Sequence, residues 1–472
     1  MDNAKHIHMI AVCGMGMGAF AGLLQEAGHR VTGSDQNVYP PMSVQLADAG
    51  IKVMSPYSPE NLKDRPDLVI IGNAVRKTNP ESSAAIEAGI PYMSFPEALD
   101  RFFLSERRSL VVAGTHGKTT TCSMAAWMLE KCGKNPGFLI GGILNNFGKC
   151  CKAGKKDGFF VTEGDEYDTA FFDKGPKFMH YRPSSAIITS VEFDHGDIYR
   201  DIEHIKSAFS AFIRLIPEGG TLVACSDFIH LREILPEASC RVETYGFNED
   251  ASWTAADISL GQKSSFTIMH NGTAVAKAEL QVPGKHNVIN AVGAVALLAS
   301  QGIDPQEAAS ALASFEGVRR RQEIRGTENG VSVIDDFAHH PTKVRATVSA
   351  IKSRYPDRTV WAVFEPRTNS SRRAFFQNDY VSSFDDADRI VIADVFNKEQ
   401  IADSDRFSSE KLVDDLNKRG LSAEFMPSAD AIISHVADNA ADGDVVLVMS
   451  NGGFENLHAR LLEALKAKSD KN

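Results

Sequence analysis

An eight-residue segment, Gly114 to Thr121, carries the residue types that bind a nucleotide phosphate. It follows an apolar run, 110–113, that predicts a buried strand, and it precedes a segment, 122–132, whose apolar spacing predicts a helix. Glycines let backbone N–H groups approach phosphate oxygens, and the helix start adds partial positive charge. Lys118 adds a full charge, and the Thr119 hydroxyl can bind Mg²⁺. The predicted ATP contacts are Gly114, Thr115, His116, Gly117, Lys118, Thr119 and Thr120.

A second glycine-rich turn lies near the N-terminus. Gly14, Gly16 and Gly18 follow the strand-like run 7–12, fit the pattern G-x-G-x-x-A, and precede Ser34 and Asp35 by about twenty positions. This spacing favours a diphosphate held at a helix N-terminus, in NAD or in a UDP-sugar. The alternative is a tight turn without a ligand.

Two acidic runs follow predicted strands of the middle segment. Glu163 comes after the strand-like run 159–161, and His195 lies in the run 192–197 that follows 187–189. The carboxyl ends of parallel strands meet at one edge, where a carboxylate is well placed for Mg²⁺. The alternatives are a solvated acidic loop and a structural histidine, although the position of His195 favours a ligand.

Two asparagines, Asn287 and Asn290, lie at the start of a further predicted helix, 284–291. Asparagine side chains can pair with adenine edges, but asparagine at a helix start is also a common cap. The local sequence by itself favours the cap.

Short apolar, β-branched runs alternate with helical patterns along the whole chain. This alternation predicts an α/β fold with parallel sheets covered by helices. A length of 472 residues suggests about three domains. We place them at 1–107, 108–317 and 318–472, and we expect a β-hairpin within 262–282 that turns at Asn271-Gly272.

The composition narrows the class of protein. A net charge of −11 argues against nucleic acid as the main partner, and no apolar run approaches the roughly 20 residues of a membrane span. The N-terminus shows no apolar signal segment, and seven cysteines without a C-x-x-C pair suggest reduced thiols. We therefore expect a cytoplasmic protein without membrane association, with Cys150 and Cys151 in a loop.

Together these motifs resemble the Mur ligase superfamily, the ATP-dependent amino-acid and peptide ligases of bacterial cell-wall synthesis. The motifs that carry the resemblance are Gly114–Thr121, Glu163, 192–195, 284–290, Arg319–Arg321 and 335–341. The gap of two residues between Gly114 and Gly117 is the short form that this family uses. The resemblance implies a Rossmann-like N-terminal domain that binds UDP-N-acetylmuramate, a central P-loop-type ATPase domain, and a Rossmann-like C-terminal domain that binds the incoming amine.

Within the superfamily the chain is most similar to the branch that joins the tripeptide L-Ala-γ-D-Glu-meso-diaminopimelate to UDP-N-acetylmuramate in peptidoglycan recycling. The supporting segments are 37–43, 71–74, 192–195, 336–341, 365–369 and 449–454. The branch that adds L-alanine is the nearest alternative, and it typically reads Pro-His-Arg-Tyr-Thr-Arg where this chain has 365–370.

The resemblance also implies roles for individual residues. Lys118, Glu163 and His195 are expected to be catalytic, with Thr119, Glu163 and His195 binding Mg²⁺, and Asn287, Asn290, Arg321 and Asp336 contacting ATP. Substrate contacts are expected from Gly14, Gly16, Gly18, Ser34, Asp35, Asn73, His339, Arg367 and Asn369. For Arg367 the alternative is a surface ion pair. Other Mur ligases carry a carbamoylated lysine where this chain has Ser210, so we expect none here.

Two functions of other classes remain open from the sequence. An NAD-dependent dehydrogenase would explain the run from Gly14 to Asp35 but leaves the Lys118 loop without a purpose. A nucleotide-binding regulator that hydrolyses ATP without ligation would explain the loop alone.

Overall fold

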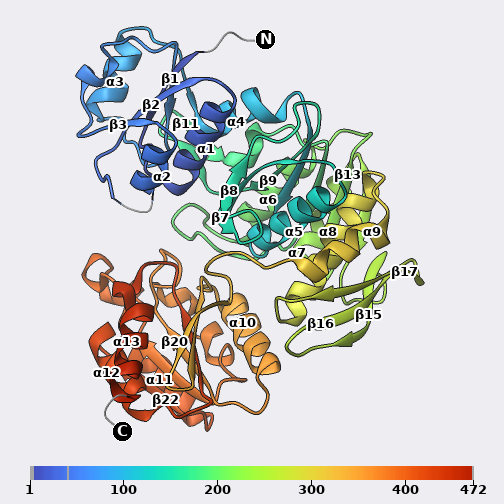
Figure 1. The fold of residues 1–472 in the computed structure, drawn as a ribbon, viewed down its shortest axis with the longest axis vertical. Helices are drawn as coiled ribbons and strands as arrows, with labels where there is room; N and C mark the ends of the chain where they lie inside the picture. Colours follow the sequence, from blue (N-terminus) through green and yellow to red (C-terminus); the bar gives the residue numbers. More distant parts are fainter. Residues whose placement is uncertain (1–4, 40–41, 470–472) are drawn as a thin grey trace.

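The computed structural model describes residues 5–39 and 42–469 and arranges them around three α/β sheets. Figure 1 shows the blue N-terminal sheet and the orange-red C-terminal sheet at opposite ends, with the central sheet between them. The predicted α/β class and the three-part architecture are confirmed. Pro40 and Pro41 of the 37–43 motif lie outside the described residues.

The first sheet has five strands in the order β3-β2-β1-β4-β5, and all its pairs are parallel. Its strands are β1 (His6–Ile10), β2 (Arg30–Ser34), β3 (Lys52–Met54), β4 (Leu68–Ile71) and β5 (Tyr92–Ser94). Its helices are α1 (Met15–Glu26), α2 (Met42–Asp48), α3 (Pro80–Glu87) and α4 (Phe95–Leu99). β1 and β4 are almost entirely buried, as expected of parallel strands covered on both faces.

The second sheet has ten strands in the order β17-β16-β15-β14-β13-β12-β6-β9-β7-β8. Its strands are β6 (Arg108–Ala113), β7 (Gly137–Leu144), β8 (Lys149–Lys152), β9 (Phe159–Gly164), β12 (Ser185–Ile188), β13 (Thr221–Cys225), β14 (Arg241–Tyr245), β15 (Trp253–Ser259), β16 (Ser264–His270) and β17 (Thr273–Leu280). β10 (Asp168–Ala170) and β11 (Asp173–Pro176) form a separate antiparallel pair. The helices are α5 (Lys118–Lys131), α6 (Ile202–Ile213), α7 (Ile229–Ile234), α8 (Lys285–Ser300) and α9 (Pro305–Ala311).

The predicted parallel core of this sheet runs from β7 to β15, and its two ends are antiparallel. β16 and β17 form the expected hairpin, turning at Asn271 and Gly272, both of positive φ. At the other end β8 pairs antiparallel with β7, so Cys150 and Cys151 lie in an edge strand rather than in a loop. The loop expectation was wrong because these short strands give little periodic signal. All seven cysteines are free thiols.

The third sheet has the order β18-β19-β23-β20-β21-β22, in which only the edge strand β18 is antiparallel. Its strands are β18 (Glu323–Glu328), β19 (Val331–Asp336), β20 (Val360–Phe364), β21 (Arg389–Ala393), β22 (Ala423–Met426) and β23 (Val445–Met449). Its helices are α10 (Pro341–Arg354), α11 (Ser409–Lys418), α12 (Ala429–Asn439) and α13 (Leu457–Ser469).

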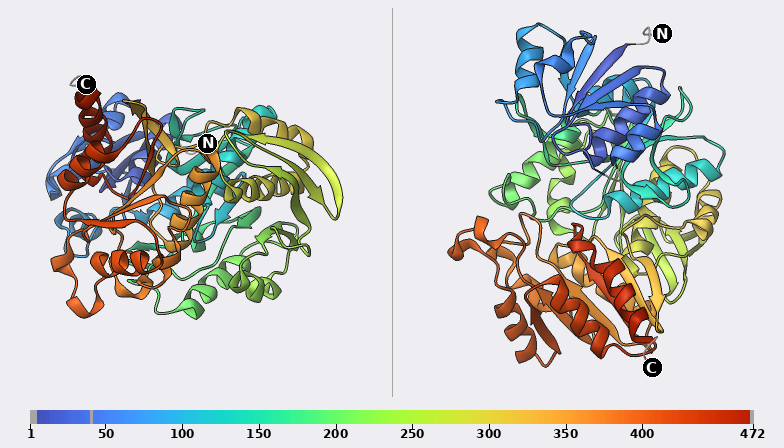
Figure 2. Two further views of the ribbon diagram at one scale, coloured as in Figure 1. Left: turned by 90° about the horizontal axis from the view of Figure 1, so that it is seen from below. Right: turned by 60° about the vertical axis from the view of Figure 1, so that its left-hand side comes forward.

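The first two sheets share a hydrophobic core, whereas the third sheet has separate cores. One buried apolar cluster runs without interruption through the first and second sheets, from Ile7 to Val318. The third sheet has two clusters of its own, whose buried members lie between Val331 and Leu465. The right-hand view of Figure 2 shows this C-terminal part set below the rest. Within the described residues, every helix is too short or too polar to cross a bilayer.

Candidate active site

The Gly114–Gly117 loop joins β6 to α5 in the middle of the central sheet, as predicted. Gly114 and Gly117 have φ of +131° and +80°, conformations that favour glycine. A Cβ at Gly114 would lie 2.2 Å from the Thr189 hydroxyl, and a Cβ at Gly117 would lie 2.9 Å from Asn290 Oδ1. Both glycines are therefore required by geometry, and the open N-terminus of α5 faces the loop as an anion site.

Lys118 begins α5, and a carboxylate that the motif analysis did not select, Glu166, holds it. Lys118 Nζ donates to Glu166 Oε2 at 2.7 Å and Oε1 at 3.0 Å, and to the Gly114 carbonyl at 2.5 Å. His195 Nε2 lies 3.3 Å from Glu166 Oε1. Burial alone would raise the pKa of Glu166, but Lys118 and His195 hold it below its usual value. Glu166 thus bridges the loop cation and the predicted metal ligand.

Glu163 and Glu166 differ sharply in their surroundings. Glu163, at the carboxyl end of β9, accepts the Gly141 N–H at 2.7 Å, and Thr119 contributes a further side-chain hydrogen bond. Burial nevertheless raises the pKa of Glu163. A half-buried carboxylate whose charge is poorly compensated, beside a hydroxyl, presents the hard oxygen donors that Mg²⁺ prefers.

His195 has a strained backbone, with φ of +54°. Its N–H donates to Asp194 Oδ1 at 2.7 Å and to Ser370 Oγ at 3.1 Å, so a residue of the third part of the chain helps to hold it. Burial would lower its pKa, but Glu166 and Asp194 raise the pKa of His195 to about 9. In the structure the His195 side chain contacts Glu166, whereas Glu163 contacts Thr119.

Beyond the loop itself, four residues are expected to contact ATP, and they surround two adjacent cavities beside the loop. They are Asn287, Asn290, Arg321 and Asp336. A small cavity of about 20 Å³ is lined by Thr120, Asn287, Arg321 and Asp336 among others. A larger one of about 270 Å³ is lined by Gly117 and Asn290, with Tyr245, Phe247 and Ile289 supplying apolar surface. The helix cap is Gly284, so neither asparagine serves as the N-cap.

Three of the polar residues at these cavities make contacts that fix their side chains. Asn287 Nδ2 donates to the Pro283 carbonyl at 2.7 Å. Asp336 accepts backbone N–H groups from Ala338 and Gln322 at 2.7 and 2.8 Å. The Arg321 guanidinium lies 4.6 Å from the centre of the Phe337 ring.

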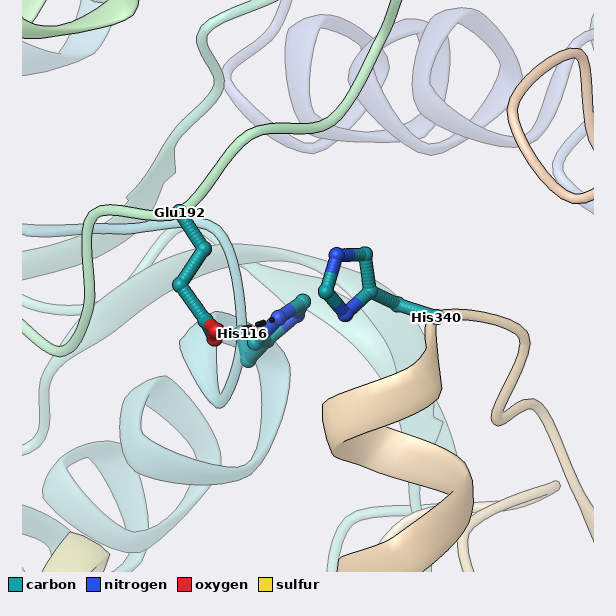
Figure 3. A group of neighbouring side chains, drawn as sticks. All are labelled: His116, Glu192 and His340. Atoms are coloured by element: carbon teal, nitrogen blue, oxygen red, sulfur yellow. Dashed lines mark ion pairs between the residues drawn. The ribbon is translucent and has the colours of Figure 1, made fainter. Parts of the chain in front are cut away.

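A cluster of His116, Glu192 and His340 connects the phosphate loop to the third part of the chain (Figure 3). His116 Nε2 lies 3.0 Å from Glu192 Oε2, and the His116 and His340 rings are 4.4 Å apart. Both His340 nitrogens are engaged, with the Phe193 carbonyl at 3.1 Å and the Thr342 N–H at 3.3 Å. Burial lowers the pKa of His340 to about 3. The cluster is therefore a contact between sheets rather than a vacant set of metal ligands.

The N-terminal glycine turn opens α1, with Gly14 as its N-cap. A pocket of about 850 Å³ is lined by Gly14 and Asp35, by Ala74 next to the predicted Asn73, and by Tyr57 and Arg76. Asp35 accepts the Cys13 and Asn37 N–H groups at 2.9 and 3.0 Å.

The other predicted residues of this turn lie around the pocket rather than in its lining. Ser34 is fully buried and donates to Glu81 at 2.7 Å, so it lies beneath the pocket. Gly16 and Gly18 lie in α1, where Gly18 packs against Met42. Asn73 is exposed.

The predicted amine-site residues lie on loops of the third sheet that reach the central sheet. Arg367 is held by buried Glu365 at 3.1 Å and lies 3.7 Å from the centre of the Phe396 ring. Asn369 Nδ2 donates to Asp197 Oδ2 at 3.0 Å. His339 lies 3.9 Å from Asp194, and burial lowers its pKa to about 4.

Comparison with known proteins identifies the family. Residues 6–107 match the model described as "Mur ligase family, catalytic domain", 112–298 match "Mur ligase middle domain", and 320–452 match "Mur ligase, glutamate ligase domain".

Individual relatives match along nearly the whole chain. The UDP-N-acetylmuramate–L-alanyl-γ-D-glutamyl-meso-2,6-diaminoheptandioate ligase of Escherichia coli (strain K12) is 40% identical over 98% of this chain and 99% of its own. The UDP-N-acetylmuramate–L-alanine ligase of Acetivibrio thermocellus is 35% identical over 95% of this chain and 93% of its own. The crystal structure of a murein peptide ligase from Psychrobacter arcticus 273-4 superposes with a TM-score of 0.71 at 35% identity, covering 98% and 99% of the two chains. The chain therefore belongs to the Mur ligase family of ATP-dependent ligases.

Proposed function

We propose that this ligase joins the tripeptide L-Ala-γ-D-Glu-meso-diaminopimelate to UDP-N-acetylmuramate, in the cytoplasm, with ATP and Mg²⁺. The observation that carries this proposal is the 40% identity, over nearly the full length of both chains, to a protein named for that reaction. Membership of the Mur ligase family argues against an NAD-dependent dehydrogenase, and it also accounts for the Lys118 loop.

We assign one substrate to each part of the chain. Residues 1–107 bind UDP-N-acetylmuramate at the pocket beside Gly14 and Asp35. Residues 108–317 bind ATP, and residues 318–472 bind the peptide near Arg367. An arginine held in place by Glu365 suits bidentate recognition of a peptide carboxylate.

The chemistry follows from the need to activate a carboxylate. The lactyl carboxylate of UDP-N-acetylmuramate attacks the γ-phosphorus of ATP, the bond from this phosphorus to the bridging oxygen breaks, and ADP leaves an acyl phosphate behind. The free amine of the tripeptide then attacks the acyl carbon, phosphate leaves, and an amide remains. The protein contributes positioning and charge neutralisation, with Lys118 placed to bind the terminal phosphates once its ammonium turns from Glu166.

The residues beside the loop fit a magnesium ion. Glu163 and Thr119 offer oxygen donors, and the raised pKa of half-buried Glu163 is that of a carboxylate that a cation would stabilise. Mg²⁺ bound there and by His195 would neutralise charge on the reacting oxygens. His195 must give up its proton to Glu166 or to solvent before it can bind a metal.

One assay tests the proposal and its nearest alternative together. Phosphate release is measured with ATP, Mg²⁺ and UDP-N-acetylmuramate, adding either the tripeptide or L-alanine. We expect release that depends on the tripeptide. The 35% identity to an L-alanine ligase makes L-alanine the second candidate, and release with L-alanine alone would replace our proposal. Release that needs neither acceptor would indicate an ATP-hydrolysing regulator.

A further inference from the structure

Lys343, on the first turn of α10, carries an ammonium that forms no hydrogen bond or ion pair among the residues that the structure describes. Lys343 is half-buried. Lys118, by contrast, is held by Glu166, and Lys352, nine residues further along α10, is held by Asp388 at 2.8 Å. Even partial burial of an ammonium that makes no hydrogen bond costs free energy, so this one requires an explanation.

The position of Lys343 relates it to the nucleotide. Its side chain lines both cavities beside the phosphate loop, the small one with Arg321 and Asp336 and the larger one with Gly117 and Asn290. α10 packs against α8, so it brings Lys343 across from the third sheet to the loop. Lys343 belongs to none of the sequence motifs described above.

Lys343 lies beside a second cation and beside carboxylates that other groups already engage. The Arg321 guanidinium, in the same small cavity, also makes no hydrogen bond or ion pair within the described segments; it packs on Phe337 and is attracted by Asp336 and Glu163. Asp336 already accepts two backbone N–H groups. Asp227, the carboxylate that lines the larger cavity, accepts the N–H groups of Phe247 and Asn248.

The pKa of Lys343 agrees with this geometry. Burial lowers it to about 8, Asp336 opposes the shift, and Arg321 adds to it. The ammonium of Lys343 and the guanidinium of Arg321 keep free N–H donors, because the nearby carboxylates of Asp336 and Glu163 already accept backbone N–H groups, and such donors suit an anion. Val282 and Val318 also line the small cavity, but their apolar side chains cannot donate a hydrogen bond to an anion.

We propose that Lys343 binds the phosphate chain of ATP, together with Arg321 and the Gly114–Gly117 loop. The proposal rests on the proposed function, because it takes ATP as the occupant of the two cavities. Lys343 donates a charge-assisted hydrogen bond to a phosphate oxygen, and the phosphate in turn relieves the repulsion between the two cations. Because α10 belongs to the third sheet, this contact also connects ATP to the part of the chain that we assign to the peptide.

Binding of ADP and of adenosine to Lys343→Met, measured by calorimetry, tests the proposal. We expect ADP binding to weaken by about tenfold or more, because the variant loses a charge-assisted hydrogen bond to a phosphate oxygen, while adenosine binding stays unchanged. Lys343→Arg keeps the charge and should retain most of the ADP affinity. Lys352→Met is the matched control on the same helix and should bind ADP as the wild type does.

The thermal stability of the free protein gives a second readout. Lys343→Met removes an unpaired cation and should leave the unfolding midpoint unchanged or higher, whereas Lys352→Met breaks an ion pair and should lower it. Unchanged ADP binding by Lys343→Met, or an equal loss for ADP and adenosine, would overturn the phosphate contact. A wild-type protein that binds no ADP would overturn the proposed function as well.

Discussion

Replacing Glu166 by glutamine should destabilise the free protein, whereas the same change at Glu163 should not. Glu166 is buried and compensates two charges, at 2.7 Å from Lys118 and 3.3 Å from His195. Removing one member of a buried charge network leaves the others uncompensated and costs about 3–5 kcal/mol. For a cooperative unit of 150–250 residues, we therefore expect the unfolding midpoint to fall by roughly 6–20 °C.

Glu163→Gln is the matched control because it makes the same chemical change three positions away, at the carboxyl end of the strand that Glu166 follows. Burial raises the pKa of Glu163, so its charge is unfavourable in the free protein. The neutral amide still accepts the Gly141 N–H, and the midpoint should stay the same or rise. We therefore expect a lower midpoint for Glu166→Gln and an unchanged or higher midpoint for Glu163→Gln, although both residues belong to one acidic run.

The assay is differential scanning calorimetry at pH 7.5, with and without ADP. The pKa of Glu166 is lowered in the folded state, so its stabilisation is present above the unfolded value near 4.5 and is lost as the pH falls through the folded value. ADP should raise the midpoint of Glu166→Gln more than that of the wild type, since its phosphates replace the missing charge at Lys118. Equal midpoints for the two variants, or a stable Glu166→Gln protein, would refute the reasoning.

Three further predictions follow from the same geometry. Lys118→Ala should abolish phosphate release that depends on the acceptor while circular dichroism shows a folded chain; near-normal turnover would contradict the role of the loop. His195→Ala should shift the Mg²⁺ titration of turnover to higher concentration, and an unchanged titration would exclude His195 as a ligand. Burial lowers the pKa of His286 to about 3, so the unfolded state binds the proton first and stability is lost as the pH falls below 6.5. This loss should reach about 2 kcal/mol at pH 5, and His286→Asn should reduce the difference in urea midpoint between pH 7 and pH 5.

Much of the fold could be predicted because parallel strands are buried on both faces. Runs such as 110–113 and 445–448 are therefore continuously apolar, and the glycine–lysine loop between a strand and a helix has few other uses. The edge strands were harder to predict. β8, for example, is short and partly exposed, so its residues resemble those of a loop.

The sequence indicated individual candidate residues of the site but not the contacts between their side chains. Glu166 lies in an acidic run from which the sequence favoured Glu163, because both residues follow the same strand and spacing cannot tell which one faces Lys118. Lys343 gave no signal, since a lysine on an amphipathic helix is usually exposed. Ser34 was expected at a substrate contact but lies beneath the pocket on Glu81, because alternate residues of a strand point to opposite faces.

By itself, the sequence determined the fold class, the phosphate loop and the family, because these depend on local patterns within a few residues of one another. The tertiary structure decided which charges meet. Lys118 pairs with a residue 48 positions away, and His195 is held by Ser370, 175 positions away. Such contacts arise only when separate strands bring their carboxyl ends to one edge and the third sheet packs against it. The pKa values of Glu163, Glu166 and Lys343 follow from that packing, because burial and the nearest opposite charge set them.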